Sequence, residues 1–129
     1  MSSTVTLTGQ IQVAQVTEGT NAELNYPARA WSNAITMTGN VIDERVLSIS
    51  TVKETISVNS DLVTLGVAVF ENMDDDNFIQ VGLDGAGTFY SFSDIQPGEV
   101  FAIRLTPGIT LQAKANIAAA KLKYTILED

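Results

Sequence analysis

Hydrophobic and polar residues alternate with a period of two along most of this chain. Near its start, hydrophobic side chains fall on one side of an extended segment, and threonine and glutamine fall on the other. Successive side chains of a β-strand point to opposite faces, so this pattern predicts a long, half-buried strand. The hydrophobic positions of this first strand are Val5, Leu7, Ile11 and Val13.

Similar short alternating segments recur up to the end of the chain and are separated by turn signals. Examples of such turns are residues 72–77, residues 84–87 and the pair Pro97-Gly98, where Asn, Asp, Gly and Pro gather. Eight to ten short strands with regular turns predict an all-β fold. We expect a two-sheet antiparallel β-sandwich that resembles a jelly roll and forms a single domain over residues 1–129.

The alternation stops over residues 16–34, where Gly19, Asn21, Asn25 and Pro27 are typical of turns. This segment is predicted as a long loop, with room for one helical turn at residues 28–31. The preceding residues 1–15 would form a long edge strand without charged side chains, and such an exposed edge tends to pair with another chain. We therefore interpret residues 1–15 as an inter-subunit strand or arm, with Thr4–Gln15 pairing across a subunit boundary.

Two aromatic residues, Tyr26 and Trp31, lie in the predicted loop. Aromatic side chains in loops can anchor a contact with a partner, and they can equally cap the end of a sandwich. Together with the hydrophobic positions of the first strand they form the candidate interface. Its members are Val5, Leu7, Ile11, Val13, Tyr26 and Trp31.

The composition removes several kinds of chemistry. The 129 residues include no cysteine and no histidine. Disulfides, thiolate metal sites and Ser–His or Cys–His nucleophile pairs are therefore excluded. No catalytic residue, metal ligand or cofactor is expected, and an enzyme is the least favoured class.

The chain is acidic, with a net charge of −8 and a pI near 4.3. An acidic surface repels phosphate backbones, so we expect no binding to nucleic acid. The start of the chain lacks the features of a signal peptide, and residues 62–70 are far shorter than the roughly 20 residues of a membrane span. We expect no membrane association.

The densest acidic cluster is Asp74, Asp75 and Asp76. Carboxylate oxygens at this density could hold a calcium ion, but the spacing of an EF-hand loop is missing. Asp also favours hairpin turns, and the turn interpretation is preferred. No metal site is predicted here.

Several short motifs follow one another in the second part of the chain. They include Phe70-Glu71-Asn72, residues 77–82 with the letters NFIQVG, and Gln96-Pro97-Gly98-Glu99, and residues 101–105, 111–115 and 121–129 continue the series. With these motifs in this order, the chain from about Val46 to Asp129 resembles small structural proteins of tailed bacteriophages. The resemblance implies a virion component with a β-sandwich fold and neither cofactor nor catalysis.

This resemblance leads to an expected function in the virion. The chain would decorate and cement the capsid by binding the lattice of the major capsid protein. It would sit on the capsid surface after assembly in the host cytoplasm. A homotrimer is expected by association, because decoration proteins usually occupy three-fold positions of a shell. The alternatives are a tail or baseplate component and, from another class, a carbohydrate-binding module.

Overall fold

The computed structural model describes residues 3–14 and 25–129, and the side chains of residues 3, 12–14 and 25–28 are left aside. The described part is all-β, with no helix, and its sheets are antiparallel, which confirms the all-β part of the predicted fold class. It consequently contains no helix that could cross a membrane. The strands are β1 Ser3–Ala14, β2 Asn25–Met37, β3 Ile42–Ile49, β4 Glu54–Thr55, β5 Leu65–Asn72, β6 Ile79–Gly85, β7 Thr88–Ile95, β8 Val100–Arg104, β9 Leu111–Ala115 and β10 Ala120–Glu128.

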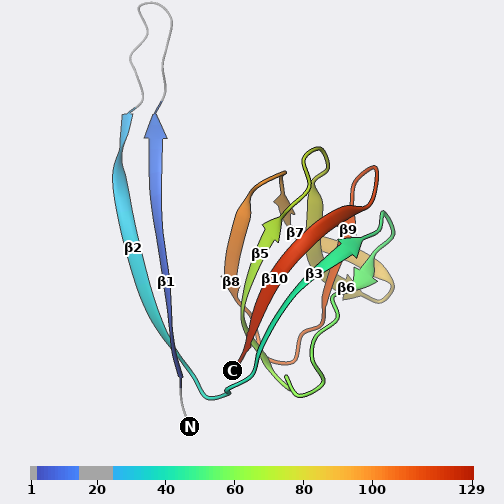
Figure 1. The fold of residues 1–129 in the computed structure, drawn as a ribbon, viewed down its shortest axis with the longest axis horizontal. Helices are drawn as coiled ribbons and strands as arrows, with labels where there is room; N and C mark the ends of the chain where they lie inside the picture. Colours follow the sequence, from blue (N-terminus) through green and yellow to red (C-terminus); the bar gives the residue numbers. More distant parts are fainter. Residues whose placement is uncertain (1–2, 15–24) are drawn as a thin grey trace, which may run out of the picture. The chain divides into compact units, whose positions relative to one another are not determined.

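The single domain predicted over residues 1–129 is divided in the structure into two compact units. Residues Ser2–Met37 form one unit, which we call the hairpin, and Thr38–Asp129 form the other, which we call the body. The hairpin contains a two-stranded sheet, and the body contains two four-stranded sheets. All strands of both units except β4 are labelled in Figure 1.

In the hairpin, β1 and β2 pair antiparallel along nearly their full length. The register runs from Ser3 opposite Met37 to Ala14 opposite Asn25, with an irregularity between Ile11 and Val13. β1 was expected to pair across a subunit boundary, yet one of its edges is already taken by β2 of the same chain. The extended strand predicted for residues 5–13 is present.

The loop prediction over residues 16–34 is wrong for residues 25–34, which belong to β2, and so is the helical turn at 28–31. Residues 16–24 of that loop lie outside the described residues. Asn25 and Pro27 were weighed as turn residues, but pairing with β1 determines the conformation here. Proline is tolerated because β2 is an edge strand, where a missing N–H need not break a ladder.

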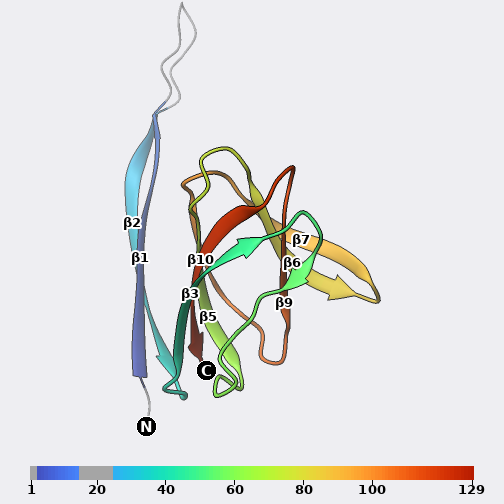
Figure 2. The same ribbon diagram turned by 45° about the vertical axis from the view of Figure 1, so that its right-hand side comes forward.

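In the body, the strand pairs are nested within one another along the chain. β6 pairs with β7, β5 with β8, β4 with β9, and β3 with β10. Two further pairings, β10 with β5 and β9 with β6, join these pairs into sheets. The resulting orders are β3-β10-β5-β8 and β4-β9-β6-β7, and the two sheets can be followed in Figure 2.

The core of the body draws side chains from both sheets. On β10, Leu122, Tyr124 and Ile126 are fully buried, which confirms the inward face predicted from their alternation. Burying one large apolar side chain contributes roughly 1.5–3 kcal/mol. The other principal members are Ile49, Ile56, Leu65, Ala68, Phe70, Ile79, Val81, Ile95, Leu105, Leu111, Ala113 and Ala115.

Buried Asn72, at the end of β5, ties two connections to the core. Its side-chain N–H groups donate to the carbonyl oxygens of Asn77 and Ile95, both at 2.8 Å. Its backbone carbonyl accepts from the N–H of Gly98, which has the positive φ of 78° that the Pro97-Gly98 turn requires. A fully buried amide is stable only when its polar atoms are satisfied in this way.

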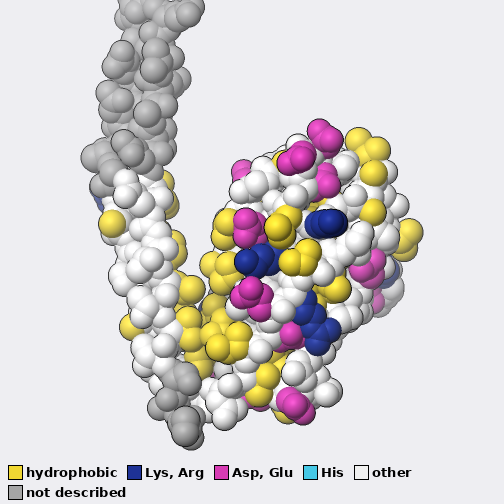
Figure 3. All heavy atoms as spheres, in the orientation of Figure 1, with side chains coloured by type: hydrophobic (Ala, Val, Ile, Leu, Met, Phe, Trp, Pro, Cys, Tyr) yellow, Lys and Arg dark blue, Asp and Glu magenta, His cyan; other side chains and the backbone are white. Residues whose placement is uncertain are grey.

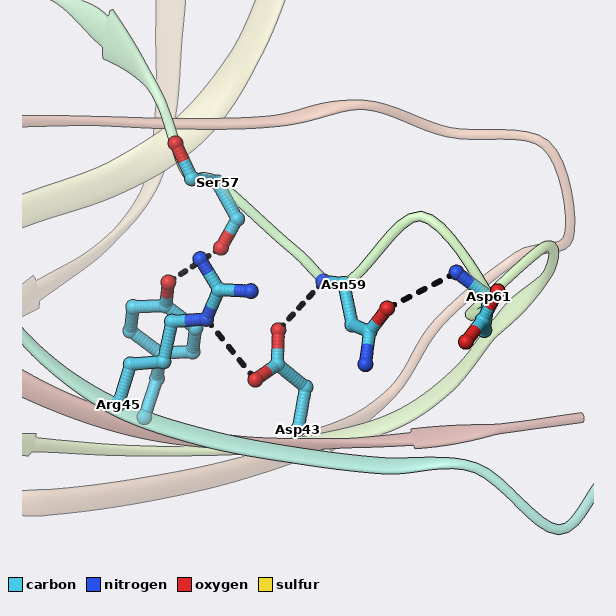
Figure 4. Close-up of polar contacts among 6 residues, drawn as sticks. Asp43, Arg45, Ser57, Asn59 and Asp61 are labelled. Carbon is cyan, nitrogen blue, oxygen red and sulfur yellow. Dashed lines mark hydrogen bonds and ion pairs between the residues drawn. The ribbon is translucent and has the colours of Figure 1, made fainter.

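A second polar network, drawn in Figure 4, attaches the segment after β4 to the outer strand β3. The carboxylate of Asp43 accepts from Nε of Arg45 at 2.9 Å and from the backbone N–H of Asn59 at 2.6 Å. The hydroxyl of Tyr124 donates to the backbone carbonyl of Ser57. Burial raises the pKa of the Tyr124 phenol.

We predict that Tyr124→Phe lowers the free energy of unfolding by about 1 kcal/mol, because the hydrogen bond to Ser57 is lost. The raised pKa means that the folded state favours the neutral phenol, so native stability falls as pH rises above the ordinary tyrosine value near 10. Urea titrations of both proteins at pH 7 and above pH 10 check this. The difference between the two proteins should shrink at high pH, and a constant or growing difference would contradict the assignment.

Candidate interaction surface

The two faces of the hairpin differ in chemistry. Residues directly opposite in the register share a face, and the pairs Val5–Ile35, Leu7–Asn33, Gly9–Trp31 and Ile11–Arg29 lie on one side. The opposite side carries small or polar residues. They are Thr4, Thr6, Thr8, Gln10, Ala30, Ser32, Ala34 and Thr36.

Four of the six residues of the predicted interface lie together on the first side. We call Val5, Leu7, Ile11 and Trp31 the hairpin face. Ile11 is 57% exposed and Trp31 46% exposed, whereas Val5 and Leu7 are half-buried. Large apolar side chains with this exposure on one face are typical of a contact surface.

Trp31 occupies a position that depends on the absence of a side chain at Gly9. A Cβ placed on Gly9 would lie 2.3 Å from Cζ2 of the Trp31 ring. The indole therefore lies against the backbone of β1, and a cross-strand aromatic residue covers the gap that glycine leaves. This contact fixes the ring on the hairpin face.

The other two residues of the predicted interface, Val13 and Tyr26, are paired with each other in the backbone register. They follow the irregularity after Ile11, and their side chains lie outside the described residues. Trp31 and Tyr26 were expected in a loop, but both belong to β2.

Charge is distributed unevenly between the hairpin and the body. The strands β1 and β2 carry one charged residue, Arg29. The body, residues 38–129, carries thirteen acidic and six basic residues, so its net charge is −7. In Figure 3 the described part of the hairpin is mainly white and yellow, and charged side chains are spread over the body. A partner would therefore meet little electrostatic repulsion at the strands β1 and β2.

The acidic cluster of the body forms a structured turn. The carboxylate of Asp74 accepts from the backbone N–H groups of Asp76 at 3.1 Å and Asn77 at 2.7 Å, and from the Asn77 side chain at 3.0 Å. Hydrogen bonds from the backbone of Asn77 and Asp76 lower the pKa of Asp74. The carboxylate therefore closes the turn, as the turn interpretation of the sequence proposed.

Several remaining carboxylates of the body are paired with basic side chains. Arg104 binds Asp129 at 2.9 Å, Lys53 binds Asp84 at 2.5 Å, and Lys123 lies 3.7 Å from Glu44. Among the described residues no group of three or more Asp or Glu side chains gathers as a metal site would require. These charges act as structural ion pairs.

One apolar groove of the body was missed by the sequence analysis. It has a volume of about 200 Å³ and joins the segment around β4 and the start of β5 to the β8–β9 connection. Val63 at the groove is 82% exposed. The lining consists of Thr55, Ile56, Val58, Leu62, Val63, Leu65, Ile109, Thr110 and Leu111. Periodicity could not reveal it, because the contributing segments are distant in sequence.

Comparison with known proteins gives no relative. No family model, no curated protein and no solved structure matches this chain. The function must therefore be argued from the geometry and chemistry of the two units.

We predict that Gly9→Ala displaces the Trp31 ring, because the added methyl group would overlap the indole. Trp31 is the only tryptophan of the chain, so its fluorescence reports this change directly. The emission should shift to longer wavelength and acrylamide should quench it more strongly. Thr8→Ala, on the opposite side of the hairpin, is the matched control, and equal spectra for both variants would refute the contact.

We predict that Asp74→Asn reduces the loss of stability in acid. The folded state lowers the pKa of Asp74, so the unfolded state binds the proton first as pH falls below about 4. The wild-type protein therefore loses this contribution in acid, and the variant lacks it at every pH. Thermal unfolding between pH 2.5 and pH 7 measures the difference. Asp75→Asn removes a charge from the same turn but keeps the hydrogen bonds that Asp74 accepts, so it is the matched control. Equal acid dependence of the two variants would contradict the assignment to Asp74.

Proposed function

We propose that this chain is a structural protein of a tailed-phage particle, which decorates and cements the capsid by binding the lattice of the major capsid protein. The observation that carries the proposal is the difference in burial and charge between the two units. A body with an extensive buried core is joined to a hairpin whose strands β1 and β2 have one apolar face and one charged residue, Arg29. The first unit suits a rigid block, and the second suits a contact element.

The strand order of the body favours a two-sheet β-sandwich of the jelly-roll type. Eight strands in the nested order, with orders β3-β10-β5-β8 and β4-β9-β6-β7, form two sheets of four. Jelly rolls consist of eight strands in two sheets and occur in viral capsid and lectin domains. This architecture alone is compatible with several functions, so the surface residues must distinguish between them.

The hairpin supports adhesion to neighbouring subunits. A single two-stranded hairpin is marginally stable in water, and it gains stability when its apolar face is covered. In this proposal the hairpin face contacts another protein of the particle. Val13 and Tyr26 extend the same strands toward the contact. The pairing of β1 with β2 replaces the expected single inter-subunit strand with a two-stranded arm.

The assembly in this proposal is a homotrimer on the capsid surface, formed in the host cytoplasm. Its partners are the major capsid protein and two further copies of the chain. The assignment to a phage particle rests on the resemblance of residues 46–129 to small phage structural proteins as read from the sequence alone. Copy number distinguishes a shell component, present in hundreds of copies, from a tail or baseplate component present in a few.

We predict that the double variant Leu7→Asp/Ile11→Asp loses both self-association and capsid binding. Each buried apolar side chain contributes roughly 1.5–3 kcal/mol, so losing two should weaken association at least about 100-fold. Light scattering of the purified full-length protein gives the oligomeric state. Co-sedimentation with undecorated capsids, quantified against the major capsid protein, gives the occupancy.

The matched control is Thr6→Asp/Gln10→Asp, which adds the same two charges to the opposite side of β1. It should retain most of the binding. If the Leu7/Ile11 variant occupies capsids as fully as the wild-type protein and the wild-type copy number is below that of a shell component, the proposed function is wrong.

A further inference from the structure

A second hollow of the body lies beside the end of β6, where β9 begins. Its volume of about 390 Å³ falls within the roughly 300–1,000 Å³ of small-ligand sites. The pairing of β6 with β9 ends at Leu83 opposite Leu111, whereas β6 continues its pairing with β7 as far as Gly85. The end of β6 is therefore open on the β9 side. The lining consists of Leu83, Asp84, Ile109, Thr110 and Gln112.

The lining combines apolar surface with hydrogen-bonding groups and has little net charge. Leu83 and Ile109 are aliphatic, whereas Thr110 and Gln112 supply a hydroxyl and an amide. The carboxylate of Asp84 accepts from Nζ of Lys53 at 2.5 Å through Oδ1, so its charge is compensated. The body carries a net charge of −7 and disfavours anionic ligands. The hollow therefore suits a neutral ligand that has both apolar surface and hydroxyl groups.

The side chain of Gln112 has hydrogen-bonding capacity that the described part of the chain leaves unused. Its Oε1 is buried and has no hydrogen-bond partner among the described residues. The terminal torsion of glutamine is soft, so the amide can turn toward the hollow without breaking a hydrogen bond to this oxygen. A buried acceptor without a partner costs free energy, and a hydroxyl donated by a ligand would remove that cost. An apolar ligand would leave the cost in place.

Next to the hollow, Tyr90 offers an aromatic ring. Tyr90 is the register partner of Leu83, so both side chains lie on one face of the sheet. A Cβ placed on Gly85 would lie 2.8 Å from Cε2 of the ring, which shows that the ring lies against the backbone there. Tyr90 is nevertheless 62% exposed. In Figure 2 the connection from β6 to β7 extends away from the other strands of the body, so a ligand can reach this ring.

We propose that the body binds a neutral oligosaccharide, with one sugar ring on Tyr90 and a neighbouring ring in the hollow. Hydroxyl groups of the sugar donate to Asp84 and to the turned Gln112, and Thr110 can donate or accept. The apolar face of a sugar ring packs against the exposed tyrosine. Tyr90 and the hollow lie on two sides of β6, and neighbouring strands are about 4.8 Å apart, so linked rings are favoured over a single ring. This activity goes beyond the proposed function and does not depend on it.

The test uses the full-length protein and defined sugars. Cellotriose, maltotriose, mannotriose and triacetylchitotriose are the neutral probes, and a hyaluronan tetrasaccharide is the anionic probe. Saturation-transfer NMR detects binding, and calorimetry gives the affinity. We expect at least one neutral trisaccharide to bind at millimolar concentration and the anionic probe to bind more weakly. The proposal is wrong if no neutral trisaccharide binds, or if the anionic probe binds best.

Variants then locate the site. Tyr90→Ala should weaken the affinity at least about tenfold, because the apolar contact with the ring is lost, whereas Tyr90→Phe should keep most of it. Val100→Ala, at another 62% exposed position outside the hollow, is the matched control. Equal affinities of Tyr90→Ala and Val100→Ala would overturn the assignment.

A variant of Gln112 separates binding from stability. Gln112→Met should weaken the affinity without lowering Tm, because Oε1 has no partner among the described residues to lose. A lowered Tm together with unchanged affinity would show that the amide serves the fold and not the ligand, and would remove it from the site.

The same variants distinguish this activity from capsid binding. Tyr90→Ala should occupy capsids as fully as the wild-type protein in the co-sedimentation measurement. If Tyr90→Ala loses capsid occupancy and no trisaccharide binds, the ring contacts a protein, so the sugar site is refuted while the proposed function stands. If a trisaccharide binds through Tyr90 but Leu7→Asp/Ile11→Asp occupies capsids normally, the sugar site stands without the proposed role of the hairpin.

Discussion

The fold of the body depends on the burial of side chains from two sheets, in which several paired strands lie far apart in the sequence. β3 and β10 are the first and last strands of the body, yet they pair along eight residues. Such long-range pairing costs loop-closure entropy, and the apolar contacts among Ile49, Phe70, Leu111 and Tyr124 must compensate for it. The polar networks around Asn72 and Asp43 then attach the connections to this core. The groove exists only because the core holds the segments around residues 56–65 and 109–111 together.

The hairpin differs from the body in the entropy cost of its strand pairing and in having no enclosed core. Its two strands are adjacent in the chain and pair locally, so forming it costs little entropy, but two strands cannot enclose a core. One side therefore keeps apolar side chains with substantial exposure, and the backbone contact between Gly9 and Trp31 organises them. Ile35 and Met37 of the hairpin are nevertheless buried, and the body also has large exposed apolar residues of its own.

Much of this organisation is readable from the sequence, and the reasons for the failures are physical. The alternation of Leu122, Tyr124 and Ile126 identified an inward face, because one side of β10 faces the core and the other does not. The hydrophobic face of β1 was found for the same reason. Residues 25–34 were misjudged because Asn25 and Pro27 signal turns locally, whereas pairing with β1 acts over a longer range. The groove has no local signal, since it is made by distant segments.

The uneven distribution of charge between the units has a consequence for the solution conditions that would favour the proposed assembly. Copies with bodies of net charge −7 repel one another, while the strands β1 and β2, proposed as the contact element, carry one charged residue and so contribute almost no electrostatic attraction. Dissolved ions screen repulsion over a Debye length of about 8 Å at physiological ionic strength and about 3 Å at 1 M salt. Added salt should therefore tighten the assembly rather than dissociate it, as is usual for apolar adhesion between acidic particles.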